Sequence, residues 1–126
     1  ARAAAGARLR VHGDGSQVRS FGAVGTFTDV VLRLLAGDAA WDLAGAPINV
    51  GSPQPTPILE LARLVRAQAG SSSPIELVPY ERDYPGRQDV AVRVPDVSRL
   101  ESLIGPTRWP PIEEIVATLA RAAQRT

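Results

Sequence analysis

The spacing of apolar residues along the chain predicts several helices. The clearest covers residues 56–69, where a threonine suits the N-cap and a proline suits the first helical position. Its apolar residues recur at intervals of three and four and form one face: Ile58, Leu61, Ala62, Val65 and Ala69. We therefore expect this helix to pack against the rest of the protein through that face.

Four other segments also have a helical pattern. One is predicted from Thr26 or Thr28 to about Ala36, with a buried stripe of Val30, Val31, Leu34 and Leu35. Another follows Pro110 and Pro111, with one apolar face: Ile112, Ile115, Val116, Leu119 and Ala123. A shorter helix capped by Asp96 is predicted to reach Ile104, and residues 1–7 have the pattern of a helix remnant that ends at Gly6.

Short extended runs separate these helices. Residues 9–12 and 17–21 flank Asp14 and Gly15, a pair that favours the positive φ angles of a tight turn, so we expect the two runs to form a β-hairpin. Apolar runs at 47–50 and 75–78 predict two more strands. The segment 80–94 is rich in charge and is predicted to be a loop.

These elements predict an α/β fold, in the form of an α+β fragment with a hairpin, short strands and three to four helices. The 126 residues are enough for one domain with a core, and we expect a single domain over 1–126. The net charge of +1 and the scattered arginines argue against nucleic acid or a membrane surface as a partner. The chain shows no signal peptide and no apolar run long enough to cross a bilayer, so we expect a cytoplasmic protein.

Several residue types are absent from the chain. It has no cysteine, and all 14 of its basic residues are arginine, which excludes disulfides and any mechanism that needs a thiolate or a lysine. It also has no methionine. Removal of an initiator methionine before Ala1 would explain this absence alone, whereas a fragment of a longer protein would also explain the helix remnant at the start.

Arg19 is the first candidate for a binding residue. An arginine on a rigid strand can donate two parallel hydrogen bonds to a phosphate at little cost in entropy. The alternative is a solvated surface arginine, which is the more common case. The single histidine, His12, and the tyrosines Tyr80 and Tyr84 are interpreted as surface or packing residues.

An ordered set of short motifs resembles a known family. The motifs are Gly13–Phe21 (GDGSQVRSF), Asp29-Val30-Val31, Asn49–Ser52 with the helix at 59–62, and Val94–Arg99 (VPDVSR). In this order they are similar to the C-terminal part of the extended short-chain dehydrogenases, the NAD-dependent nucleotide-sugar epimerases and dehydratases. The resemblance covers nearly the whole chain.

The resemblance implies that the chain lacks the redox machinery of these enzymes. The family binds NAD through a glycine-rich turn and uses a tyrosine with a lysine four residues later. Here Val18 replaces the third glycine of the dinucleotide pattern, and Tyr84 follows Tyr80 where the lysine would stand. We therefore expect no catalytic residue, no metal and no bound cofactor in this chain, which corresponds to a substrate-binding subdomain without its Rossmann domain.

The resemblance also implies the site residues. Arg19 matches the arginine that contacts the nucleotide diphosphate, and Arg93 and Arg87 are the alternatives for a second contact. Asp29 is interpreted as a hydrogen-bond acceptor at the start of a helix, and Asn49 and Gly51 as structural. The chain departs from the family in carrying extra residues between Phe21 and Asp29 and a broken Gly-Trp pair, Gly105–Trp109.

Three hypotheses about function follow from the resemblance. The first is the nucleotide-sugar-binding portion of an NAD-dependent epimerase or dehydratase, inactive without its cofactor domain. The second is a standalone, non-catalytic sugar-nucleotide binder or partner subunit, and the third is a remnant without a site. The implied partners are a UDP- or dTDP-linked sugar and an NAD-binding domain or subunit. If the chain exists alone, we expect its apolar faces at 1–7 and 47–50, which would otherwise pack against the lost domain, to form a homodimer or an exposed apolar patch.

Overall fold

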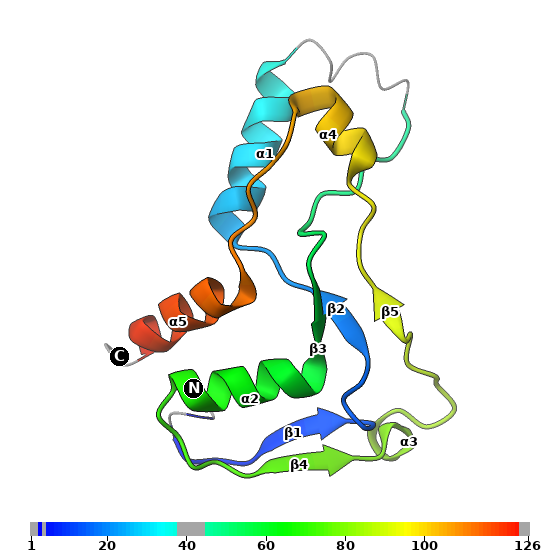
Figure 1. Ribbon diagram of the computed structural model, residues 1–126. Helices are drawn as coiled ribbons and strands as arrows, with labels where there is room; N and C mark the ends of the chain where they lie inside the picture. The colour runs from blue at the N-terminus through cyan, green and yellow to red at the C-terminus, as the bar shows by residue number, and fades with distance from the viewer. Residues whose placement is uncertain (1–2, 4, 38–44, 124–126) are drawn as a thin grey trace.

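The structure is a computed structural model that describes residue 3 and residues 5–37 and 45–123 (Figure 1). Trp41, which falls in a predicted loop, lies outside the described residues. In chain order the elements are β1 (Leu9–His12), β2 (Val18–Ser20), α1 (Val24–Ala36), β3 (Pro55–Pro57), α2 (Ile58–Gln68), β4 (Ile75–Val78), α3 (Tyr80–Asp83), β5 (Val92–Arg93), α4 (Ser98–Ile104) and α5 (Ile112–Ala123). This mixture of short strands and helices confirms the predicted α/β class.

The strands form two small sheets. β1 and β4 pair in parallel, from Leu9 opposite Ile75 to His12 opposite Val78. In the second sheet β2 lies in the centre, antiparallel to β3 and parallel to β5. Figure 1 shows α2 lying along β1 and β4, with α5 beside it, while α1 and α4 lie together at the opposite end of the molecule. The second sheet connects the two ends.

The predicted hairpin is wrong, although both of its strands exist. The chain turns after β1 with positive φ at Gly13 (69°) and Gly15 (78°), but β1 and β2 then join different sheets. The parallel pairing with β4 buries Val11 and Val78, which are 3% and 1% exposed. These two valines lie on opposite faces of the pair, because Val78 is in register with His12 and not with Val11. Pairing with the distant strand is therefore accompanied by burial on both faces.

Helix α1 begins earlier than predicted. It starts at Val24 without a side-chain cap, so Thr26 and Thr28 lie inside its first turns rather than at the N-cap. The hydroxyl of Thr28 donates to the carbonyl of Val24 at 3.0 Å. Asp29 is consequently an exposed residue within the helix, and most residues between Phe21 and Asp29 are helical rather than an added loop.

The predicted start of the long helix is also wrong. Residues 55–57 form β3, and α2 begins only at Ile58 with Pro57 at its N-cap. Thr56 is 7% exposed and lies opposite Arg19 in the sheet, so it belongs to a strand instead of capping a helix. The Thr-Pro pair thus serves as an extended edge beside β2, a position that proline tolerates.

Three further segments differ from the predictions. Residues 47–50 form no strand, yet Ile48 and Val50 pack against the core. The predicted loop at 80–94 contains α3 and β5. The described part of 1–7 is a turn, in which the amide of Gly6 donates to the carbonyl of Ala3 at 3.1 Å.

The remaining elements lie close to their predicted positions. β4 and α5 are confirmed, and α4 begins at Ser98, two residues after its predicted cap. The carboxylate of Asp96 accepts hydrogen bonds from the amide (2.9 Å) and the hydroxyl (2.6 Å) of Ser98. These bonds hold the pKa of Asp96 below its usual value, because they favour the ionised form.

A compact apolar cluster joins α1 to α4. Its buried members are Val30, Val97, Leu100 and Trp109, with Leu34, Ile48, Val50 and Ile104 packed around them. The predicted stripe of α1 is therefore half correct: Val30 is fully buried, whereas Leu35 is 70% exposed. Among the described residues, no helix combines the length and the apolar character needed to cross a membrane.

Candidate functional site

Arg19 lies at the centre of the second sheet. On β2 it is opposite Thr56 of β3 on one side and Arg93 of β5 on the other. Its Nη1 donates to the carbonyls of Val18 and Val90, both at 2.8 Å. Its Nη2 donates to Oδ1 of Asp89 at 2.5 Å. The Arg19 and Asp89 side chains are 20% and 25% exposed, so this ion pair is partly shielded from water.

Arg93 is the second arginine that the structure brings to this place. Since β2 and β5 are parallel and the two residues are in register, their side chains leave the same face of the sheet. Arg93 is exposed and lines a cavity of about 660 Å³, together with Ser20, Phe27, Asn49, Asp96 and Trp109. Arg19 does not line this cavity, although Ser20, its neighbour on β2, does.

Side-chain hydrogen bonds to backbone carbonyls join residues that line the cavity. The Ser20 hydroxyl donates to the carbonyl of Ser52, and the side-chain Nδ2 of Asn49 donates to the backbone carbonyl of Asp96 at 3.1 Å. Gly51 lies against Pro95: a Cβ at this glycine would come within 3.2 Å of the proline ring. Asn49 and Gly51 do not end a strand, as was predicted, but they pack this loop against residues 95 and 96.

Arg87 lies on the exposed segment between α3 and β5. Its backbone amide donates to the carbonyl of Tyr84 at 3.2 Å, and within the described part of the chain its guanidinium has no recorded partner. It does not line the cavity at Arg93. The structure thus brings Arg19 and Arg93 together and leaves Arg87 apart.

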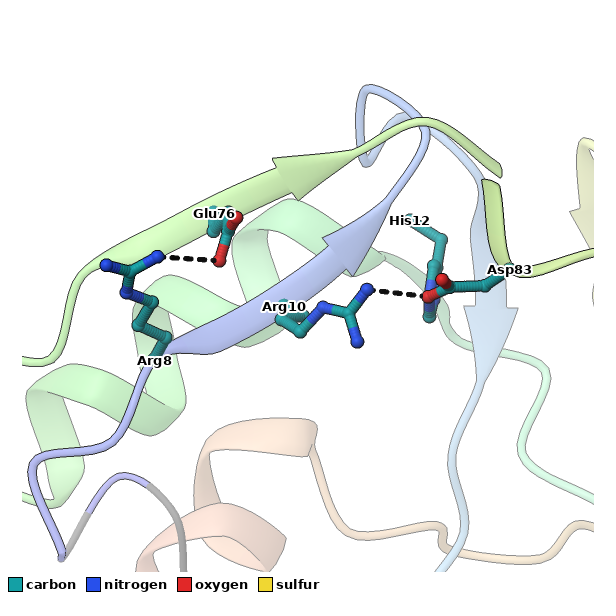
Figure 2. A network of polar contacts seen from close by, with 5 residues as sticks. All are labelled: Arg8, Arg10, His12, Glu76 and Asp83. Atoms are coloured by element: carbon teal, nitrogen blue, oxygen red, sulfur yellow. Dashed lines mark hydrogen bonds and ion pairs between the residues drawn. The ribbon is translucent and has the colours of Figure 1, made fainter. Parts of the chain in front are cut away.

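A second polar cluster fixes the start of this segment (Figure 2). Oδ2 of Asp83 lies 2.7 Å from Nη2 of Arg10 and 2.8 Å from Nε2 of His12. The hydrogen bond with His12, aided by the charge of Arg10, lowers the pKa of Asp83 below its usual value. His12 also meets the ring of Tyr84 edge-on, and Tyr84 stacks on Tyr80 with ring centroids 4.8 Å apart.

Residues 80–93 are therefore tied to the body of the protein by two carboxylates. Asp83 binds residues of β1, and Asp89 binds Arg19 of β2. Neither contact was predicted from the sequence. Their only signal was the charge density of the segment, because the partners lie about seventy positions away in the chain.

The Gly13-Asp14-Gly15 turn does not fit a dinucleotide. A Cβ on Gly15 would lie 2.6 Å from Cβ of Leu59 and 3.0 Å from Cγ1 of Val11, so this glycine allows helix α2 to pack against the turn. The Asp14 carboxylate accepts bonds from the Ser16 hydroxyl (2.6 Å) and amide (2.9 Å), which lowers its pKa. The space beside Gly15 is thus filled by Leu59 and Val11.

Metal ligation finds no support in the described residues, where no three histidine, cysteine, aspartate or glutamate side chains gather.

Comparisons with known proteins agree with the fold and with the motif order. No family model matches the chain. It is 30% identical over 94% of its length to UDP-glucuronic acid decarboxylase 1 of Danio rerio, and 36% identical over 75% to a UDP-N-acetyl-alpha-D-glucosaminuronate decarboxylase of Bacillus cytotoxicus. It spans only 25% and 29% of these two relatives.

Solved structures show the same partial correspondence. The UDP-glucuronic acid 4-epimerase of Bacillus cereus, solved with UDP-glucuronic acid and NAD, superimposes with a TM-score of 0.77 at 18% identity. The match covers 94% of this chain and 35% of the epimerase. The chain therefore belongs with the extended short-chain dehydrogenases of the NAD-dependent nucleotide-sugar epimerase and dehydratase family, and it corresponds to their C-terminal part.

Proposed function

We propose that this chain is the nucleotide-sugar-binding part of an NAD-dependent epimerase, dehydratase or decarboxylase. The observation that carries the proposal is the pair of arginines in register on β2 and β5, Arg19 and Arg93. Two guanidinium groups on one face of a sheet suit the two phosphates of a nucleotide diphosphate, because each can donate paired hydrogen bonds to phosphate oxygens. The relatives named for UDP-linked sugar acids support a UDP-sugar as the ligand.

Arg93 is our choice for the second phosphate contact, in preference to Arg87. It is exposed beside Arg19 and it lines the adjacent cavity, whose volume of about 660 Å³ falls in the range of small-molecule sites. Asn49 and Asp96 supply polar groups at the same cavity. The sugar would then lie toward the cavity while the diphosphate lies over the two strands.

Catalysis and cofactor binding belong to a partner in this proposal. The chain has no lysine, and the turn at Gly15 is filled by Leu59. The partner is an NAD-binding domain, in the same polypeptide or in a separate subunit, and residues 1–126 form one binding domain beside it. Exposed apolar residues on α1, such as Val24 (81%) and Leu35 (70%), are available for such a contact or for a second copy of the chain.

Calorimetry with UDP tests the proposal. We expect the 126-residue chain to bind UDP, and Arg19→Ala to weaken binding by more than about tenfold, because a charged hydrogen-bonding group is lost. Arg8→Ala is the matched control: Arg8 is a 72% exposed arginine next to β1 whose nearest carboxylate oxygen, on Glu76, lies 3.6 Å away. Equal affinity in wild type and Arg19→Ala would overturn the role of Arg19.

A further inference from the structure

Asp89 lies at the proposed site but has no role in the function proposed above. Its carboxylate is three-quarters buried, and it lies against the one arginine that is fixed by several bonds at the proposed site. We infer that Asp89 is a positioning residue, which holds the Arg19 guanidinium in a single orientation with one edge open to an anionic ligand. The ligand part of this inference rests on the proposed function.

A count of hydrogen-bond donors supports this role. A guanidinium has five N–H groups. In Arg19 the two on Nη1 are taken by the carbonyls of Val18 and Val90, and one on Nη2 is taken by Asp89. Within the described part of the chain, Nε–H and the second N–H of Nη2 have no recorded partner.

The Nε–H donor of Arg19 is accessible to a ligand. The buried side-chain nitrogens and oxygens without a partner are, in the described residues, Thr107 Oγ1 and Trp109 Nε1, and Nε of Arg19 is not one of them. Nε therefore reaches solvent. An oxyanion that takes the two remaining donors leaves the three existing bonds intact.

A ligand that instead displaced Asp89 would gain little. The carboxylate would remain in its partly buried position without its cation, and an uncompensated buried charge is costly. Asp89 also neutralises Arg19, so the attraction for an anion at this place comes from Arg93, whose side chain is exposed on the adjacent strand. Asp89 thus orients the Arg19 guanidinium, and Arg93 provides the net positive charge that attracts an anion.

The orientation of Arg19 is measurable without any ligand. Nitrogen-15 NMR of the guanidinium gives separate signals for Nη1 and Nη2 when rotation about the Cζ–N bonds is hindered, and averaged signals when it is free. We expect separate signals for Arg19 in the wild-type chain and averaged signals in Asp89→Asn. Asp83→Asn is the control, because Asp83 ties the same segment through Arg10 and His12 and does not touch Arg19.

UDP affinity provides the second readout. We expect Asp89→Asn to weaken UDP binding about tenfold, and Asp89→Glu to restore part of it, since glutamate keeps the charge. Unchanged Arg19 signals in Asp89→Asn would overturn the inference whatever the affinity, and so would tighter UDP binding, which would make Asp89 a competitor of the ligand. If the wild type binds no UDP, the proposed function fails, while the NMR comparison still decides whether Asp89 positions Arg19.

Discussion

Nε2 of His12 and Oδ2 of Asp83 lie 2.8 Å apart, joining the end of β1 to the short helix α3 (Figure 2). The bond matters because the segment that begins at α3 continues to Asp89 and Arg93 at the proposed site. His12 and Asp83 are not proposed to bind the ligand, but they fix the start of residues 80–93, which end at the proposed binding residue Arg93. This relationship has a measurable dependence on pH.

We expect Asp83→Asn to lower the melting temperature at pH 7 but to have little effect in acid. The folded state lowers the pKa of Asp83 below the ordinary value of 3.8, so its carboxylate stabilises the fold above that pH. The contribution is lost as the pH falls through the folded-state pKa. Melting curves of both proteins between about pH 2 and pH 7 measure this, in the range where aspartate titrates.

Asp29→Asn is the matched control for the Asp83 experiment, since Asp29 is exposed on α1 with no recorded partner in the described residues. It should shift the melting temperature little at any pH. A difference between wild type and Asp83→Asn that stays constant down to the lowest pH would contradict the stabilising role of the ionised carboxylate.

Substitution at two neighbouring glycines separates backbone strain from packing. Gly13 and Gly15 both have positive φ, but a Cβ on Gly13 meets only Oε1 of Gln17 at 4.0 Å, whereas one on Gly15 would lie 2.6 Å from Cβ of Leu59. We expect Gly13→Ala to cost about 1 kcal/mol of unfolding free energy and Gly15→Ala about 3 kcal/mol. Urea unfolding of the two variants measures the difference, and equal losses would show that Gly15 is not required for packing.

The two candidates for the second phosphate contact can be compared directly. We expect Arg93→Ala to weaken UDP binding about tenfold and Arg87→Ala to change it by less than about twofold, since only Arg93 is in register with Arg19. Calorimetry on both variants measures the two affinities. The salt concentration must be the same in both experiments, because charged contacts weaken as salt rises. The reverse order of affinities would place the second contact on Arg87 and move the ligand away from the cavity.

The sequence predicted where most elements lie and failed on how they pair. The runs at 9–12 and 75–78 alternate as strands should, but nothing local tells residues 9–12 to choose a partner more than sixty positions away over the run at 17–21. The pairing depends instead on tertiary packing, which buries Val11 and Val78. The Thr-Pro pair at 56 and 57 was wrongly predicted to start a helix. Its strand conformation depends on pairing with β2, which is also a contact between distant parts of the chain.

The candidate site was likewise predictable only in part. Arg19 and Arg93 could be named from motif order, since each stands in a short recognisable stretch. Asp89 could not, because its significance lies in a contact with Arg19 across seventy positions of chain. The true start of α1 was hidden by two threonines that resemble caps, whereas the helix begins at Val24 without one.

The structure of the chain with UDP bound tests the central claim most directly. We expect diphosphate oxygens within about 3 Å of Arg19 Nε or Nη2 and of the Arg93 guanidinium, with the Arg19–Asp89 ion pair still in place. A diphosphate bound elsewhere, with both arginines facing solvent or protein only, would contradict the account.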